Sequence, residues 1–321
     1  MYLVFDVGGT FIKYALMTID GNILEKHKVS TDSCGNNLNG FITLLSGIYQ
    51  SYKEGNMIEG IALAIPGLVD VENGIVYEGG ALPYLHKMNI GAILSEACDG
   101  ITVALENDGK CAALAEVWQG NAKDCDNAFL IVVGTGIGGG IVINRHVYRG
   151  NALVAGELSF LLENMTREEV EDFDDIDNAE TSEERWKCGK YIAAGCCSTN
   201  ALRKRVANEK GISEHDISGE DIFQMAEQGD KVCIDAIEDM CFMLAKHCMD
   251  IYMIMNPDII LIGGGISAQP KFIPCIQKYA DKIRKITHMY DKLVIKPCKF
   301  GNDSNLIGAL YHYIQRYIIG S

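Results

Sequence analysis

An acidic residue at the junction of an expected strand and an expected helix is the first candidate for chemistry. Asp108 follows the apolar run Ile101–Leu105, and apolar residues at helical spacing continue from there to Trp118. A carboxylate in this place can accept the proton of an attacking hydroxyl, while Asn107 orients a neighbouring hydroxyl of the same substrate. Asn and Asp also favour helix N-caps, so a purely structural role for either residue is the alternative.

Two glycine-rich turns offer backbone that can hold phosphate groups. Apolar runs flank the turn over 134–140, and the turn over 8–10 has the same plan of strand, turn and strand. Glycine closes turns without strain, and backbone without Cβ also admits phosphate oxygens to consecutive N–H groups. Because the plan occurs twice, we expect two similarly folded halves with one phosphate loop each. The expected nucleotide-binding residues of these hairpins are Gly8, Gly9, Thr10, Lys13, Gly134, Thr135, Gly136 and Gly138.

A third glycine turn follows the apolar run over 257–262. Gly263, Gly264 and Gly265 come before an expected helix over 272–285, a position that suits the close approach of a flat ring such as adenine. A tight connection between a strand and a helix is the alternative. None of the three turns has the G-x-x-x-x-G-K-[ST] pattern.

Two further carboxylates stand beside these turns. Asp6 comes just before the first turn, and a carboxylate next to phosphates repels them unless a cation stands between. We therefore expect Asp6 to contact Mg²⁺ through water, with an acidic turn residue and no metal as the alternative. Glu157 follows the second hairpin, and we expect it to accept hydrogen bonds from sugar hydroxyls unless it is a solvated turn residue.

Composition limits the class of protein. The chain has 321 residues with 48% hydrophobic and 22% charged residues, which is ordinary for a soluble protein long enough for two domains. A formal net charge of −15 argues against nucleic acid as a partner. The twelve scattered cysteines and the lack of a signal pattern at the start predict reduced thiols in the cytoplasm, and the apolar stretch over 241–255 carries charges that argue against a membrane span.

The elements that position these residues alternate between strands and helices, which predicts a mixed α/β fold with ligands at the strand ends. In the first half we expect hairpins over 3–17 and 69–80, strands over 58–65 and 101–105, and helices over 37–52, 90–97 and 111–118. In the second half we expect a hairpin over 128–143, strands over 257–262 and 293–297, and helices over 201–208, 219–228, 231–255, 272–285 and 305–318. The acidic stretch over 163–184 is expected to be solvated surface.

Six motifs in order resemble those of the ROK family (repressors, open reading frames and kinases) of the hexokinase/actin-like ATPase superfamily. The resemblance covers nearly the whole chain. It includes the phosphate motifs Asp6–Thr10 and Gly134–Gly140, the sugar-side loop Ile65–Asp70, the catalytic motif Glu106–Asp108, the sugar glutamate in Gly156–Glu157 and the adenosine motif Gly263–Gly265.

The resemblance implies two RNase H-like (actin-like ATPase) domains flanking a cleft. The sugar-side lobe would span residues 1–118, completed by the C-terminal helix 304–319, and the nucleotide-side lobe would span residues 119–303. ATP and Mg²⁺ would be co-substrates in the phosphorylation of a hexose or a hexose derivative, usually at O6 as in a glucokinase. Asp108 would be the general base, and Gly67, Asn107 and Glu157 would bind the sugar.

The same resemblance bears on partners and on the alternative function. It implies a homodimer or homotetramer. The repressors of the family carry a helix-turn-helix domain before their first phosphate motif, whereas Asp6 lies almost at the start of this chain. A non-catalytic sugar-sensing protein without a DNA-binding domain is therefore the alternative to a kinase.

The chain departs from the family pattern where the family binds zinc. Phe160 occupies the place of the usual histidine, only Cys188-Gly189 and Gly195-Cys196 echo the cysteine motif, and no acidic residue lies between Glu184 and Glu209. We expect no zinc site and an altered sugar pocket, because each lost hydrogen bond is worth roughly 0.5 to 1.5 kcal/mol. A hexose other than glucose, an N-acetylated hexose or a β-glucoside is then an alternative substrate.

Overall fold

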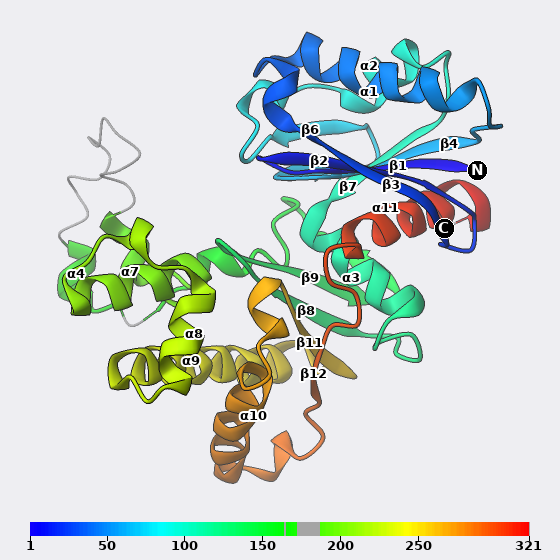
Figure 1. Cartoon of the computed structure of the whole chain (residues 1–321). Coiled ribbons are helices and arrows are strands. Elements are labelled where there is room, and N and C mark those ends of the chain that lie inside the picture. Colours follow the sequence, from blue (N-terminus) through cyan, green and yellow to red (C-terminus); the bar gives the residue numbers. More distant parts are fainter. Residues whose placement is uncertain (164, 172–186, 321) are drawn as a thin grey trace. The chain divides into compact units, whose positions relative to one another are not determined.

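The computed structural model describes residues 1–163, 165–171 and 187–320, which form a mixed α/β protein with two five-stranded sheets (Figure 1). The chain divides into two compact units. Unit 1 holds residues 1–126, 140–155 and 302–321, and unit 2 holds residues 127–139 and 156–301. The predicted α/β class is confirmed, and the lobe boundary expected after residue 118 stays a prediction.

The sheet of unit 1 has the strand order β3-β2-β1-β4-β7. Strand β1 pairs antiparallel with β2 and parallel with β4, and β4 pairs parallel with β7. In register, Asp6 lies opposite Ala64, and Ala64 lies opposite Glu106. The C-terminal ends of β1, β4 and β7 therefore meet at one edge of the sheet, where polar residues can gather. The strands are β1 (Tyr2–Val7), β2 (Phe11–Met17), β3 (Ile23–Ser30), β4 (Gly60–Ile65) and β7 (Val103–Asn107), and a separate hairpin joins β5 (Leu68–Asp70) to β6 (Ile75–Glu78).

Helices cover both faces of this sheet (Figure 1). One face packs Leu3 and Phe5 of β1 into a core with Phe41 of α1 (Leu38–Lys53) and Leu94 of α2 (Ile90–Ala97). The other face contacts α11 (Ser304–Ile314), which also packs against α3 (Asp108–Gln119).

Glycine permits close contacts on that second face. A Cβ at Gly308 of α11 would lie 1.7 Å from the carbonyl oxygen of Cys111, so the two helix backbones touch there. A Cβ at Gly60 would lie 2.3 Å from the hydroxyl of Tyr313, whose ring packs 5.2 Å from that of Tyr2. The short elements of unit 1 are η1 (Thr31–Cys34), η2 (Pro83–Leu85) and the π-helical turn η10 (Gln315–Ile319).

The second sheet has the order β10-β9-β8-β11-β12. Strands β8, β11 and β12 are parallel, and β10 pairs antiparallel with β9. The strands are β8 (Ala128–Val133), β9 (Ile137–Ile143), β10 (His146–Tyr148), β11 (Ile259–Gly263) and β12 (Ile295–Pro297). The helical elements of unit 2 are η3 (Leu158–Phe160), α4 (Arg167–Glu171), η5 (Lys187–Tyr191), α6 (Ala194–Cys197), α7 (Thr199–Lys210), η6 (Glu214–Asp216), α8 (Gly219–Glu227), α9 (Lys231–Met255), η7 (Gly265–Ala268), α10 (Phe272–Ile283), η8 (Arg284–Ile286) and η9 (His288–Tyr290).

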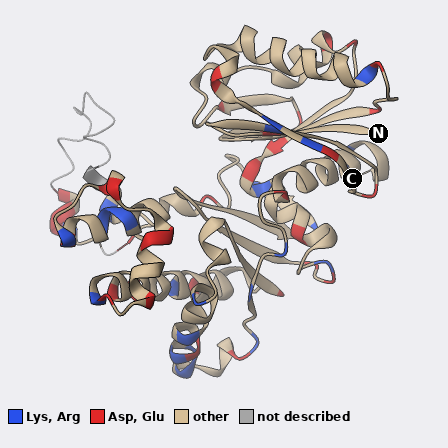
Figure 2. Cartoon of the chain, viewed as in Figure 1, with Lys and Arg blue, Asp and Glu red and all other residues tan. Residues whose placement is uncertain are grey.

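Local sequence explains the long helix α9. The side chain of Asp230 caps its start by accepting a hydrogen bond from the N–H of Cys233, at 3.1 Å. Asn256 ends it in the left-handed region with a φ of 47°, and Pro257 follows. Figure 2 shows acidic and basic residues interspersed over the helices of unit 2, while the strands of its sheet carry few charges.

Most predicted elements are present, and the exceptions are instructive. The hairpins β1–β2, β5–β6 and β8–β9 and the helix over 231–255 are confirmed, whereas strands β3 and β10 were not predicted. Of the expected acidic surface, residues 164 and 172–184 lie outside the described residues. No helix among the described residues has both the length and the apolar composition that a membrane span requires.

Candidate active site

The junction of β7 and α3 positions two of the predicted residues. Asn107 is the N-cap of α3, and its Oδ1 accepts a hydrogen bond from the N–H of Lys110 at 3.1 Å. Asn107 therefore caps the helix, and the same side chain also donates from Nδ2 to the carbonyl oxygen of Gly67 at 2.9 Å. Asp108 is the first residue of α3 and is partly exposed, where the helix N-terminus favours a negative charge.

Gly67 fixes the predicted sugar-side loop against this junction. Its φ is +94°, and an added Cβ would lie 1.8 Å from the carbonyl oxygen of Glu78. Only glycine fits both conditions. The hydrogen bond from Asn107 then holds the loop and the start of α3 together, so three of the four predicted sugar-side residues lie at one edge of the sheet of unit 1.

Asp6 lies at the same edge, since β1, β4 and β7 are in register there. It is 6% exposed, and both of its carboxylate oxygens accept hydrogen bonds. Lys13 donates from Nζ to Oδ2 at 2.8 Å, and Asn305 donates from Nδ2 to Oδ1 at 2.9 Å. The turn over 8–10 that follows Asp6 is closed by the N–H of Gly8, which donates to the carbonyl oxygen of Phe11 at 3.0 Å.

A buried cluster behind this edge was not predicted. Glu106 is 0% exposed and accepts a hydrogen bond at Oε2 from Nε of Arg149 at 3.0 Å, while its Oε1 accepts from the N–H of Asn107 at 2.8 Å. Nδ1 of His312 lies 3.9 Å from the same carboxylate, and burial lowers the pKa of His312 to about 4. The cluster therefore fixes the residue directly before Asn107 in place. Glu106 stands in the predicted motif, but no sequence signal connects it with Arg149 or His312.

In unit 2, the turn between β8 and β9 is held by its backbone and by the start of α7. The N–H of Gly134 donates to the carbonyl oxygen of Gly136 at 2.9 Å, and the N–H of Thr199 donates to the carbonyl oxygen of Gly134 at 2.9 Å. An added Cβ at Gly136 would meet no described atom within 4 Å, and its φ is not positive. The fold itself therefore does not require glycine at Gly136, which leaves the approach of a ligand as a reason for it.

The third glycine turn packs against the end of β8. Gly264 has a φ of +91°, and an added Cβ would lie 2.1 Å from the carbonyl oxygen of Val133. Ser267 closes the turn by donating from Oγ to the carbonyl oxygen of Gly264 at 2.7 Å. Gly263, Gly264 and Gly265 are thereby brought next to the glycine turn over 134–138 within unit 2.

Glu157 directly precedes the short turn η3, and Phe160 is the last residue of this turn. The N–H of Phe160 donates to the carbonyl oxygen of Glu157 at 3.3 Å, and the ring of Phe160 is 69% exposed. A Cβ at Gly139 would lie 2.6 Å from the carbonyl oxygen of Gly156, so η3 starts in close contact with β9. Glu157 itself is partly exposed. The predicted site residues thus form two sets, one around Asp6, Gly67 and the Asn107–Asp108 junction in unit 1 and one around the glycine turns and Glu157 in unit 2.

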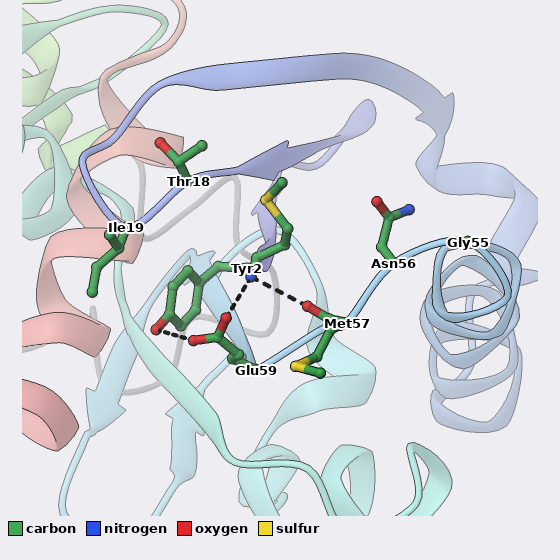
Figure 3. A pocket seen from close by; sticks show the side chains of 8 residues that line it. Tyr2, Thr18, Ile19, Gly55, Asn56, Met57 and Glu59 are labelled. Atoms are coloured by element: carbon green, nitrogen blue, oxygen red, sulfur yellow. Dashed lines mark hydrogen bonds and ion pairs between the residues drawn. The ribbon is translucent and has the colours of Figure 1, made fainter.

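A surface pocket of about 520 Å³ contains none of these residues (Figure 3). It lies at the start of β1, the strand end opposite to Asp6, and Met1, Tyr2, Met57 and Glu59 are among its lining residues. The terminal amine of Met1 donates to Oε1 of Glu59 at 2.8 Å and to the carbonyl oxygen of Met57 at 3.2 Å, and the hydroxyl of Tyr2 donates to Oε2 of Glu59 at 3.1 Å. The terminal amine, the hydroxyl of Tyr2 and the carboxylate of Glu59 therefore satisfy one another.

Known proteins match this chain over nearly its full length. A family model described as the ROK family matches residues 2–316. A β-glucoside kinase of Klebsiella pneumoniae is 30% identical over 320 residues, covering 98% of this chain and 96% of that protein. A glucokinase of Halalkalibacterium halodurans is 27% identical over 337 residues, covering 96% of this chain and 93% of that protein.

Solved structures give the same result for the fold. A ROK family protein from Streptococcus pneumoniae TIGR4, crystallised with sucrose, is 30% identical and superposes with a TM-score of 0.81 over 98% of each chain. The expected actin-like ATPase fold is thereby confirmed.

Proposed function

The chain belongs to the ROK family, and on this premise we propose that this sugar kinase transfers the γ-phosphoryl group of ATP to O6 of a hexose or a hexose derivative. Asp108 is the general base: its carboxylate accepts the proton of the sugar hydroxyl while the hydroxyl oxygen attacks the γ-phosphorus and ADP leaves. The observation that carries this proposal is the β7–α3 junction. There Asp108 opens α3, and Asn107 holds the Gly67 loop against it.

Gly67, Asn107 and Glu157 bind the sugar in this proposal. Asn107 is already held by the N–H of Lys110 and by the carbonyl oxygen of Gly67, so it presents a fixed surface to the substrate. The partly exposed Glu157 supplies a carboxylate for sugar hydroxyls. Fixed polar groups of this kind keep the reacting hydroxyl close to Asp108, which lowers the entropic part of the barrier.

Nucleotide binding is assigned to the glycine turns. Backbone N–H groups of the turns over 8–10 and 134–138 bind its phosphates, and Gly263–Gly265 accept the adenosine. The open space at Gly136, where glycine is not needed for packing, supports this role. Magnesium ion, when bound, neutralises charge on the phosphates. Asp6 fits a contact with it through water, because both carboxylate oxygens already accept hydrogen bonds from Lys13 and Asn305.

A β-glucoside is the sugar that we place first among the substrates. The relative from Klebsiella pneumoniae is named a β-glucoside kinase. The exposed ring of Phe160 cannot donate a hydrogen bond to a sugar hydroxyl, but it offers apolar surface to an aglycone. Free glucose and N-acetylated hexoses then rank below it.

A coupled assay of ADP release tests the proposal with cellobiose, an aryl β-glucoside, glucose and N-acetylmannosamine as acceptors. We expect turnover with at least one sugar, and a loss of kcat of about 10²- to 10⁴-fold in Asp108→Asn with nucleotide binding retained. Glu96→Gln removes an exposed carboxylate from α2 of the same unit and should leave kcat unchanged. ATP binding without turnover on any sugar would favour the non-catalytic sensor, and an unimpaired Asp108→Asn would exclude Asp108 as the base.

A further inference from the structure

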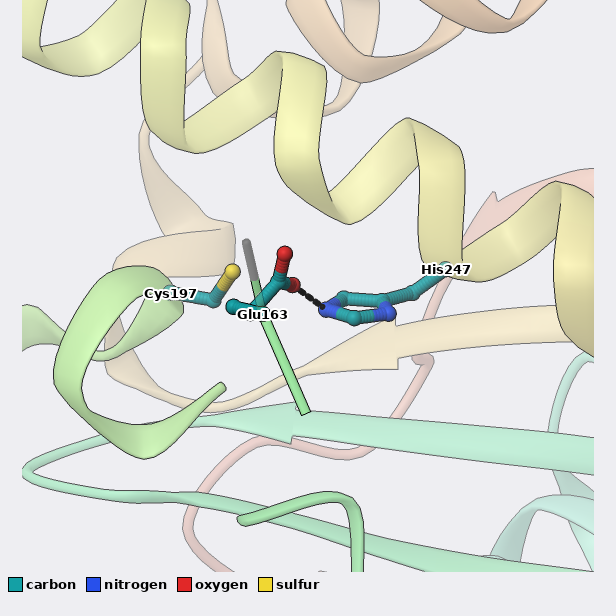
Figure 4. Close-up of side chains that lie close together, drawn as sticks. All are labelled: Glu163, Cys197 and His247. Atoms are coloured by element: carbon teal, nitrogen blue, oxygen red, sulfur yellow. Dashed lines mark ion pairs between the residues drawn. The ribbon is translucent and has the colours of Figure 1, made fainter. Parts of the chain in front are cut away.

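Three buried side chains that the kinase site does not use come together in unit 2 (Figure 4). Glu163 follows η3, Cys197 is the last residue of α6, and His247 lies in α9. They are 3%, 0% and 5% exposed, and one carboxylate oxygen, the thiol sulfur and one imidazole nitrogen all lie within 4.8 Å of one another. Such a set of oxygen, sulfur and nitrogen donors is rare in a protein core unless it has a common partner.

Two of the three ligand atoms lack hydrogen-bond partners. Oε1 of Glu163 and Nε2 of His247 lie 2.5 Å apart, yet neither makes a hydrogen bond of acceptable geometry among the described residues. Lys246 is the nearby cation, and its Nζ lies 3.7 Å from the other oxygen of Glu163. Because buried polar atoms are nearly always hydrogen-bonded, this close ion pair without a hydrogen bond calls for an explanation.

We propose that Glu163, Cys197 and His247 bind a zinc ion. Zinc accepts carboxylate oxygen, thiolate sulfur and imidazole nitrogen together, and it prefers four ligands, so three side chains leave one position for water. The carboxylate and the thiolate balance the charge of the ion, while Lys246 keeps its contact with the second oxygen of Glu163.

This site is different from the one whose absence the sequence predicted. That prediction rested on the family's histidine position, which Phe160 occupies, and on the broken cysteine motif around Cys188 and Cys196. None of the three proposed ligands stands at those positions. The proposal therefore revises the expectation of no zinc site for this chain.

Backbone hydrogen bonds place the ligands independently of any ion. The N–H of Glu163 donates to the carbonyl oxygen of Tyr191 at 2.7 Å, and the N–H of Ala193 donates to the carbonyl oxygen of Leu161 at 2.9 Å. The segment after η3 thus runs beside the chain that leads into α6. A zinc ion would tie both segments to α9, and it would restrain η3, which carries Glu157.

Metal analysis of the full chain, purified without a metal-binding tag, tests the proposal. We expect about one zinc ion per chain and a loss of zinc affinity of more than about 100-fold in Cys197→Ser and in Glu163→Gln. Cys248→Ala is the matched control, because Cys248 is a fully buried thiol next to His247 on the same helix but outside the cluster. It should keep its zinc.

Cobalt substitution adds a readout that does not depend on the folding of a variant. Co²⁺ added to the metal-free wild-type chain should produce a thiolate-to-cobalt charge-transfer band, and the band should persist in Cys248→Ala. A wild-type chain that binds neither zinc nor cobalt would overturn the proposal. Zinc retained in Cys197→Ser at the wild-type affinity would overturn it as well, since the ion would then be held elsewhere.

Discussion

Arg149 donates from Nε to Oε2 of Glu106 at 3.0 Å, and this completely buried carboxylate stands directly before Asn107 in the chain. The arginine follows β10, 43 residues further along the sequence. The pair therefore links the end of β10 to β7, the strand that leads into the proposed base Asp108 at the start of α3.

Arg149→Met should destabilise the protein because it leaves the charge of Glu106 buried without its partner. We expect the free energy of unfolding in urea to fall by roughly 3 kcal/mol, the lower end for a broken buried pair, since Arg149 keeps some contact with solvent. The double variant with Glu106→Gln should recover part of the loss. Arg167→Met breaks an exposed pair with Glu171 and should cost less than about 1 kcal/mol. Equal losses in the two single variants would show that burial of the pair has no consequence.

His312 should make stability depend on pH. Burial depresses its pKa from 6.5 to about 4, against the attraction of Glu106 and Glu72 and together with the repulsion of Arg149 and Arg316. Between these two values the unfolded chain binds a proton that the folded chain does not, so the free energy of unfolding falls as the pH decreases through this window, by at most roughly 3 kcal/mol.

Urea titrations of wild type and His312→Leu at pH 7 and about pH 4.5 measure this contribution. The variant cannot take up the proton, so it should lose less stability than wild type over the same interval. Identical losses in both proteins would assign the acid sensitivity to other groups.

Two glycines of unit 2 should respond differently to alanine. In Gly264→Ala the backbone would have to keep a positive φ, and the new Cβ would lie 2.1 Å from the carbonyl oxygen of Val133. The substitution should therefore lower the free energy of unfolding by more than about 2 kcal/mol. Gly136 has no positive φ, and an added Cβ there would contact no described atom, so the free energy of unfolding of Gly136→Ala should stay within about 0.5 kcal/mol of wild type. If phosphates approach this backbone, the KM for ATP should nevertheless rise in Gly136→Ala, and an unchanged KM would remove Gly136 from the proposed nucleotide site.

Asp6→Asn should raise the Mg²⁺ concentration that gives half-maximal rate, by about tenfold, because a neutral amide attracts the hydrated ion less. Asp303→Asn is the control, since Asp303 pairs with Lys26 at 2.6 Å on the same unit and has no proposed contact with the nucleotide. A magnesium titration of the sugar-dependent rate distinguishes them. The same midpoint in Asp6→Asn and wild type would contradict a role for Asp6 near the ion.

Much of the fold could be predicted because its signals are local. Glycine turns between apolar runs predicted the hairpins, and apolar residues at helical spacing predicted the helix over 231–255. Strand β3 was not predicted because it is an edge strand whose mostly exposed residues include Glu25, Lys26 and Lys28, so it has no apolar periodicity. Strand β10 has only three residues.

In the candidate site too, only the features that are local in sequence could be predicted. Motifs of consecutive residues, such as Glu106–Asp108, could be recognised from the sequence, although their roles stay predictions. The partners of Glu106 could not be recognised from the sequence. Arg149 and His312 are distant from Glu106 in the chain, and neither is part of a sequence motif. The cluster of Glu163, Cys197 and His247 was not predicted for the same reason, since tertiary packing alone brings these three residues together.

The place of α11 has a consequence for how the protein is made. Its backbone touches α3 at Gly308, and Tyr313 fits over Gly60 in the sheet built from the first part of the chain. During synthesis that apolar surface stays uncovered until residues 304–314 have left the ribosome, so unit 1 acquires its second layer only after residues 156–301 of unit 2 have been synthesised.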